Sequence, residues 1–247
     1  MADDFVPSAA GARFPPTRQS AVLGAGSEDP AARARSMDVL VRAYWKPVYA
    51  HVRRRWNRSP EQAQDLTQGF FARAFEKQFF ATYDPGKALF RTFLKTCLDR
   101  FVMEQSRDEH RLKRGGSALR LHLDFDAAEG ELQRLGMPAD TEVDRCFDDA
   151  WMRHLLSSAV ERLRVQCEAK DKKVWFDLFE RYSLDEGSKP TYAELAASFG
   201  ISAAQVTNHL AAARREFRAI VLDELRELTS TEEEFRSEAR ALLGVEP

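Results

Sequence analysis

The residues with the clearest chemistry lie between positions 191 and 218, where amide, hydroxyl and cationic side chains follow a helical pattern. The pattern predicts a short amphipathic helix ending at Gly200, because glycine adopts the left-handed conformation of a helix end without steric cost. Ser202 can then cap a second helix. Val206 and Leu210 would pack that helix against the first, and the outward-facing residues would be Gln205, Thr207, Asn208 and His209. The second helix has the width of the DNA major groove, which predicts a helix-turn-helix. A helical hairpin without a DNA role is the alternative.

A second segment whose residue types suit nucleic-acid binding is 44–114, where aromatic rings lie beside lysines and arginines. Most of these rings must form a core, since a helical bundle needs large apolar residues. However, a loop with Tyr83 and Lys87, next to a helix with basic residues along one face, has what single-stranded DNA requires. Rings stack on an extruded base, and cations neutralise the backbone.

Charge is segregated along the 247 residues, although the net charge is only −2. Residues 42–58 contain six Lys/Arg and no carboxylate, and residues 91–120 contain eight Lys/Arg and four carboxylates. Residues 122–149 reverse this balance, with nine carboxylates and two arginines. This pattern indicates two modules that face a polyanion, joined by a segment that DNA would repel.

The elements that must position these residues are all helical, because no segment shows a convincing period of two. We expect Ser59-Pro60-Glu61 to start one helix, and Pro47 to bend or break another. The acidic stretch 122–149 resembles a linker with one short helical turn. The tail could hold the bundles together, bind a regulator or extend the last helix, and extension is the simplest expectation. The predicted domains are a flexible arm (1–35), a first bundle (36–116), an acidic linker (117–149), a second bundle ending in the helix-turn-helix (150–221) and an acidic helical extension (222–247).

Several function classes are disfavoured. Cys97, Cys146 and Cys167 are never closely spaced, which fits a reducing cytosol. No apolar run approaches the length of a membrane span, and the first residues lack the features of a signal peptide. We therefore expect a cytoplasmic protein without membrane association. The histidines show no metal-ligand spacing, and Gly24-Ala25-Gly26 opens no phosphate loop. We expect no metal, no cofactor and no catalytic site.

Three runs of the first bundle, together with the second module, resemble the extracytoplasmic-function (ECF) sigma factors. These runs are Tyr44–Arg55, Ser59–Phe75 and Phe90–Phe101, which are similar to the family's first conserved domain. The helix-turn-helix and the run Arg214-Arg215-Glu216-Phe217-Arg218 resemble its second domain. The resemblance covers roughly residues 36–221 in the right order.

The resemblance implies roles for individual positions. Asp65, Leu66 and Gln68 match a helix that docks on core RNA polymerase. Glu61 and Arg53 are expected to take part in the same polymerase contact. The turn 83–89, including Tyr83 and Lys87, and Phe90 match the loop that captures a flipped base of the minus-ten element. The cations that would line the DNA-facing side of the next helix are Arg91, Lys95, Arg100, Arg107 and Arg111. The residues that would face the minus-thirty-five element are Ser202, Gln205, Thr207, Asn208 and His209, with Arg214, Arg215 and Arg218 on its phosphates. The acidic linker matches a segment that threads toward the RNA-exit channel.

Two departures from the family pattern are visible. Gln62 and Gln64 stand where the family usually has carboxylates, which predicts a weaker polymerase dock. Phosphorylation of Thr67 would restore negative charge there and is a hypothesis, against the simpler interpretation of a solvent-facing residue. The recognition helix also lacks usual cations at Thr207 and His209. A regulator such as an anti-sigma protein, a Ser/Thr kinase or another recruiter could supply binding energy.

The resemblance predicts a subunit that selects and opens promoters. One alternative is a free-standing regulator that uses the helix-turn-helix without polymerase. Another is a polymerase-binding adaptor controlled by phosphorylation or by a partner.

Overall fold

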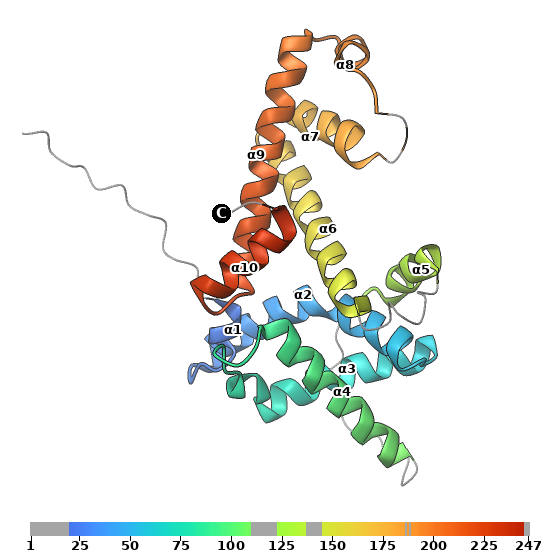
Figure 1. Cartoon of the computed structure of the whole chain (residues 1–247), viewed down its shortest axis with the longest axis vertical. Helices are drawn as coiled ribbons and strands as arrows, with labels where there is room; N and C mark the ends of the chain where they lie inside the picture. The colour runs from blue at the N-terminus through green and yellow to red at the C-terminus, as the bar shows by residue number, and fades with distance from the viewer. Residues whose placement is uncertain (1–19, 110–122, 137–144, 186, 188, 245–247) are drawn as a thin grey trace, which may run out of the picture.

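The computed structural model describes residues 20–109, 123–136, 145–185, 187 and 189–244, and every regular element in these ranges is a helix or a helical turn (Figure 1). The all-α prediction is confirmed for this part of the chain. The elements are α1 (Ala21–Gly24), α2 (Pro30–Arg55), α3 (Pro60–Lys77), the 3-10 turn η1 (Phe79–Thr82), α4 (Phe90–Glu109), α5 (Phe125–Leu135), α6 (Cys146–Ala169), α7 (Lys173–Phe179), the π turn η3 (Glu180–Leu184), α8 (Tyr192–Phe199), α9 (Ala203–Glu227) and α10 (Glu232–Leu243). We call α1–α5 the first lobe and α6–α9 the second lobe.

The first lobe begins earlier than the sequence suggested. Ser20 caps α1, and Ala21 and Val22 are buried in the core. Asp29 caps α2 by accepting hydrogen bonds from the first amides of the helix, where Pro30 lacks the N–H that such a position leaves unused. The expected flexible arm therefore does not extend to residue 35, and its remainder, 1–19, lies outside the described residues. Pro47 lies inside α2, which continues to Arg55, so of the predicted bend or break the break does not occur.

The start of α3 follows the local signal in the sequence. The Ser59 hydroxyl accepts the N–H of Gln62, and the Gln62 side chain accepts the N–H of Ser59. This reciprocal capping box satisfies two amides that a helix start would otherwise leave unpaired. The predicted helix start at Ser59-Pro60-Glu61 is confirmed.

The acidic stretch contains more structure than a linker with one helical turn, so that expectation is wrong. Asp124 caps α5, whose residues 125–135 form an amphipathic helix on the surface of α2. The Phe125 ring packs at 5.5 Å from Trp45 and 5.3 Å from Tyr49, measured between ring centroids. Phe125 and Ala128 are the buried residues of this short helix, which lies within a segment dominated by carboxylates.

The second lobe is built on two long helices, α6 and α9, which run side by side away from the first lobe (Figure 1). Near the first lobe, the buried side chains of α6 join the first lobe's core. Farther along, α7 and η3 pack against α6 and α9, and α8 lies at the far end of α9. The second lobe thus holds α8 and the start of α9 away from the first lobe.

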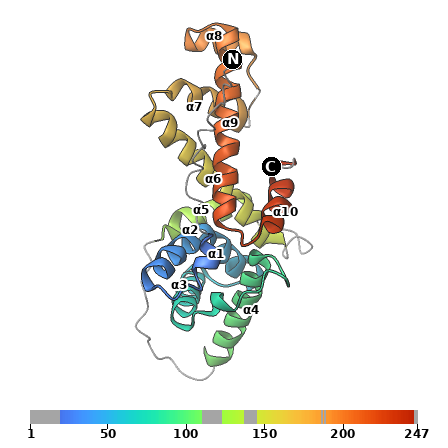
Figure 2. The ribbon, with the colours of Figure 1, turned by 90° about the vertical axis from the view of Figure 1, so that its left-hand side faces the viewer.

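The tail turns back instead of extending α9, so the expectation of a simple extension is wrong. Helix α9 ends at Glu227 beside the first lobe, Thr231 caps α10, and α10 runs back from there alongside the end of α9 (Figure 2). Phe235 and Ala239 of α10 are buried in the same hydrophobic cluster as Phe90 and Leu94 of α4. This cluster continues across the expected domain boundaries near residues 150 and 221. No helix within the described ranges is long and apolar enough to cross a membrane.

Candidate nucleic-acid and polymerase interface

Two capping boxes fix the geometry of α8 and α9. Thr191 and Glu194 form one at the start of α8, and Ser202 and Gln205 form the other at the start of α9. Between the helices, Gly200 adopts φ 64° and ψ 33°, the left-handed conformation in which an L side chain is strained. The buried residues that hold the two helices together are Leu178, Leu195, Val206 and Leu210. The sequence located this pair of helices through its caps and its glycine.

The start of α9 presents three of the predicted side chains to solvent, namely Gln205, Thr207 and Asn208. The Gln205 side-chain oxygen already accepts the Ser202 N–H at 2.9 Å, which leaves its NH2 group to donate to a ligand. The Thr207 hydroxyl donates to the Ala203 carbonyl oxygen at 3.1 Å. His209 differs from the expectation: it is half-buried, with its ring stacked on Trp175 at 5.9 Å.

The predicted phosphate-binding cations follow about two to three helical turns later on α9. Arg214, Arg215 and Arg218 are exposed. The Arg214 guanidinium lies over the Tyr182 ring at 5.2 Å from the centroid, which restricts its orientation. Exposed amides followed by exposed cations give this surface donors for base edges and positive charge for phosphates.

The predicted base-capturing residues do not form an open site. Phe90 is fully buried, and its ring packs at 5.2 Å from Tyr83 and 5.6 Å from both Tyr44 and Phe80. In this conformation the ring cannot stack on an extruded base, which corrects the expectation for Phe90. Tyr83 is half-buried and its hydroxyl donates to the Ala88 carbonyl at 2.9 Å. Lys87 is exposed, 3.2 Å from the Asp84 carboxylate.

The expected row of cations on α4 is divided between paired and exposed members. The Arg91 guanidinium lies 2.7 Å from both Asp148 and Glu238, and 5.1 Å from the Trp151 ring centroid. Lys95 lies 3.8 Å from Asp148. Arg100 and Arg107 are exposed, whereas Arg111 lies outside the described residues.

The predicted polymerase-docking residues lie on and beside α3. Glu61 and Asp65 are exposed and Gln68 is half-buried, so these three can contact a partner. The amide of Glu61 and the Ser59 hydroxyl lower the pKa of the Glu61 carboxyl. Leu66, in contrast, is buried in the core.

Arg53 has a structural role in the first lobe. Its guanidinium contacts both Glu129 oxygens, at 2.7 and 2.8 Å. The same carboxylate accepts the Tyr49 hydroxyl at 2.7 Å. Leu66 therefore belongs to the core beneath α3, and Arg53 links α2 to α5.

Thr67 does not face solvent, contrary to the simpler sequence interpretation. Its side chain has no exposed area, and among the described residues its hydroxyl oxygen has no hydrogen-bond partner. A kinase cannot reach this hydroxyl while α3 is packed. The burial corrects the phosphorylation hypothesis for this conformation.

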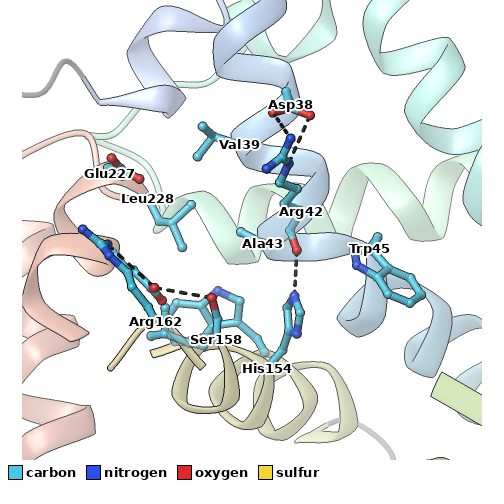
Figure 3. Close-up of a pocket in the computed structure, with 13 residues that line it drawn as sticks. Asp38, Val39, Arg42, Ala43, Trp45, His154, Ser158, Arg162, Glu227 and Leu228 are labelled. Atoms are coloured by element: carbon cyan, nitrogen blue, oxygen red, sulfur yellow. Dashed lines mark hydrogen bonds and ion pairs between the residues drawn. The ribbon is translucent and has the colours of Figure 1, made fainter. Parts of the chain in front are cut away.

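A cavity of about 410 Å³ lies between the lobes, beside their shared core, and is lined by α2, α6 and the end of α9 (Figure 3). Arg42 pairs with Asp38 one turn earlier in α2, and His154 of α6 contacts the Arg42 carbonyl oxygen at 2.6 Å. Desolvation lowers the pKa of His154, which favours the neutral ring. Arg162 pairs with Asp223 across the α6–α9 contact. The cavity walls thus contain paired charges.

Four carboxylates that contact predicted site residues were missed by the sequence analysis: three pair with site cations, and one accepts the N–H of Phe90. They are Glu129, Asp148, Glu234 and Glu238. Their partners lie far away in the sequence, so no local spacing reveals the pairs. The segregation of charge was the available signal, because an acidic segment next to basic ones can neutralise them within one chain. Within the described ranges no group of three potential metal ligands is present.

Comparison with known proteins places this chain in a family. A family model described as ECF sigma factor matches residues 33–223, which run from the start of α2 to within α9 and leave α10 outside. No curated protein and no solved structure matches the chain. The family match covers most of the chain and includes both the α3 segment and the α8–α9 pair. The chain belongs to the ECF sigma factor family.

Proposed function

We propose that this chain binds core RNA polymerase through the exposed face of α3 and contacts promoter DNA at two places. Family membership assigns it a sigma-factor role in transcription initiation. The observation that best supports the finer assignment is the start of α9, where Gln205, Thr207 and Asn208 are exposed ahead of exposed arginines. A helix with this arrangement fits the major groove of the minus-thirty-five element.

The polymerase contact is proposed for Glu61, Asp65 and Gln68, whose side chains reach the surface of α3. The contact with the melted minus-ten strand is proposed for Tyr83, Lys87 and the cations of α4. Because Phe90 is buried and Arg91 is paired, this second contact requires a rearrangement at the start of α4. A regulatory partner, such as an anti-sigma protein or another recruiter, is part of the proposal because the docking helix carries few carboxylates.

The test is run-off transcription with the purified chain, core polymerase and a library of promoter fragments. We expect initiation at a shared sequence motif, abolished by the paired change D65A/Q68A. The matched control is Q64A, an exposed change on the same helix. Duplex binding without core polymerase would support a free-standing regulator, and polymerase binding without initiation would support an adaptor. Either result contradicts the proposal.

A further inference from the structure

Helix α10 lies outside the family match, yet it packs on the end of α4 that the proposed function assigns to single-stranded DNA (Figure 2). Two of its carboxylates, Glu234 and Glu238, are buried, with exposed fractions of 7% and 4%. Buried carboxylates are rare unless they are paired or hydrogen-bonded. Both have partners in the proposed DNA site.

Glu234 occupies the N-terminal end of α4. One of its carboxylate oxygens accepts the N–H of Phe90 at 2.8 Å, and the Tyr83 hydroxyl lies 3.4 Å from the same oxygen. The other oxygen accepts the N–H and the hydroxyl of Ser230 at 2.7 and 2.8 Å. The first amides of a long helix form a site for an anion, including a phosphate group. Here a carboxylate of the same chain fills that site.

Glu238 forms an ion pair with the adjacent cation, Arg91. Its carboxylate lies 2.7 Å from the Arg91 guanidinium, which also contacts Asp148 at 2.7 Å. Arg91 is therefore engaged by two carboxylates, one from α10 and one from the start of α6. A nucleic-acid phosphate would have to approach Arg91 against the negative charge of both carboxylates, which already neutralise the guanidinium.

The same helix is held by apolar contacts and by a short connection. Phe235 and Ala239 are buried with the first lobe, and the Arg226 guanidinium lies over the Phe235 ring at 4.1 Å from its centroid. Only residues 228–231 separate α10 from α9. A short connection keeps the effective concentration of α10 at this site high, so a strand must compete with a tethered ligand.

We propose that α10 is an intramolecular competitor of the DNA strand: Glu234 and Glu238 occupy the α4 amide and the Arg91 guanidinium that would bind its phosphates. This proposal rests on the proposed function of the α4 end. In the free chain, α10 closes the site, and productive strand binding displaces α10. The competitor lies in a segment that the family match does not cover.

The experiment compares two paired substitutions on α10 in the full chain. E234Q/E238Q removes the two buried charges, whereas E232Q/E233Q removes two exposed charges from the same helix and is the matched control. The probe is a fluorescein-labelled pool of random single-stranded DNA about 20 nucleotides long, used at low ionic strength. We expect E234Q/E238Q to bind the probe about tenfold more tightly than the wild type. We expect the control to change binding by less than about twofold. Equal gains for both pairs, or no gain for E234Q/E238Q, would overturn the proposal.

Hydrogen exchange on the wild-type chain gives a second readout that needs no substitution. We expect saturating probe to increase exchange in residues 232–243, because the strand displaces α10. Unchanged protection of α10 at saturation would also overturn the proposal. Far-UV circular dichroism and thermal unfolding verify that both variants are folded.

Run-off transcription separates this inference from the proposed function. If the wild type initiates transcription while E234Q/E238Q binds the probe no more tightly, only the inference fails. If E234Q/E238Q gains affinity while neither chain initiates, only the proposed function fails.

Discussion

Glu129 fixes part of the acidic segment to the first lobe, because it binds two side chains of α2. Its two oxygens receive the Arg53 guanidinium and the Tyr49 hydroxyl. The hydrogen bond from Arg53 is the main cause that lowers the pKa of Glu129 to about 2, against the opposing effect of burial. Folding therefore favours the ionised Glu129 carboxylate, and this carboxylate fixes α5 to α2.

The pH dependence of stability follows from this pairing. Because folding lowers the pKa of Glu129, its contribution is complete above about pH 4.5 and is lost as the pH falls toward 2. We expect E129Q to lower the unfolding free energy by about 2 kcal/mol at pH 7, and by progressively less below pH 4.5. Urea titrations across this pH range measure the difference. E131Q is the control, because Glu131 forms a more exposed pair with Lys46 and should change stability by less than about 1 kcal/mol. A pH-independent effect of E129Q would contradict the assignment.

Thr67 gives a second prediction for a single residue. Replacement by valine keeps the side-chain shape and removes a buried hydroxyl that lacks a partner among the described residues. We expect T67V to raise the unfolding free energy by up to about 1 kcal/mol. T67D should lower it by more than about 3 kcal/mol, because it places a charge in the core. Thermal unfolding measures both, and a T67D chain as stable as the wild type would show that the hydroxyl is accessible.

The two kinds of residue on α9 should affect DNA binding differently. Asn208 can contact a base edge, whereas Arg215 can contact phosphate. We expect N208A to reduce discrimination between promoter sequences by about 1–3 kcal/mol. R215A should weaken binding to all sequences to a similar extent. It should also reduce the slope of log K against log salt concentration by about one, because one phosphate contact is lost. Titrations of the polymerase complex with promoter fragments at several salt concentrations separate these effects. Equal loss on all sequences for N208A would contradict its assignment.

At the scale of elements, the helix starts with local chemical signals were predictable. Ser59 with Gln62, and Gly200 followed by Ser202, each act within a few residues, so sequence spacing reveals them. The end of α9 and the return of α10 depend instead on contacts between Glu234 or Glu238 and α4. These partners are more than 140 residues apart in the chain, and no periodicity encodes such pairs. The burial of Thr67, which the simpler interpretation of the sequence placed in solvent, likewise depends on packing between helices.

Alanine substitutions of two glycines test the helix end at Gly200 and the helix α5. Gly200 has φ 64° with no neighbouring atom where a Cβ would lie, so G200A should lower the unfolding free energy by about 1 kcal/mol through backbone strain alone. Gly130 lies inside α5, also with open space at its Cβ position. G130A should raise the unfolding free energy by up to about 1 kcal/mol, because alanine favours a helix. Chemical denaturation measures both, and a destabilising G130A would argue against α5 as a helix.

At the scale of the whole molecule, one hydrophobic cluster connects the first lobe with α6, the end of α9 and α10. Phe235 is 3% exposed within it. We expect F235A to lower the unfolding free energy by about 3–4 kcal/mol and to increase hydrogen exchange in α4 as well as in α10. Leu135 is 48% exposed, and L135A is the control, with an expected change below about 0.5 kcal/mol. Exchange that increases only in α10 would show that the tail is energetically separate from the first lobe.

The position of α10 at the end of the fold also has a consequence for protein synthesis. Helix α4 is complete at Glu109, whereas α10 begins only at Glu232. At translation rates of about 5–20 residues per second, the interval between them is on the order of ten seconds. During that interval the nascent chain has its α4 amide and Arg91 without Glu234 and Glu238. Every molecule therefore passes once through an uncovered state at the ribosome, before the finished chain closes on itself.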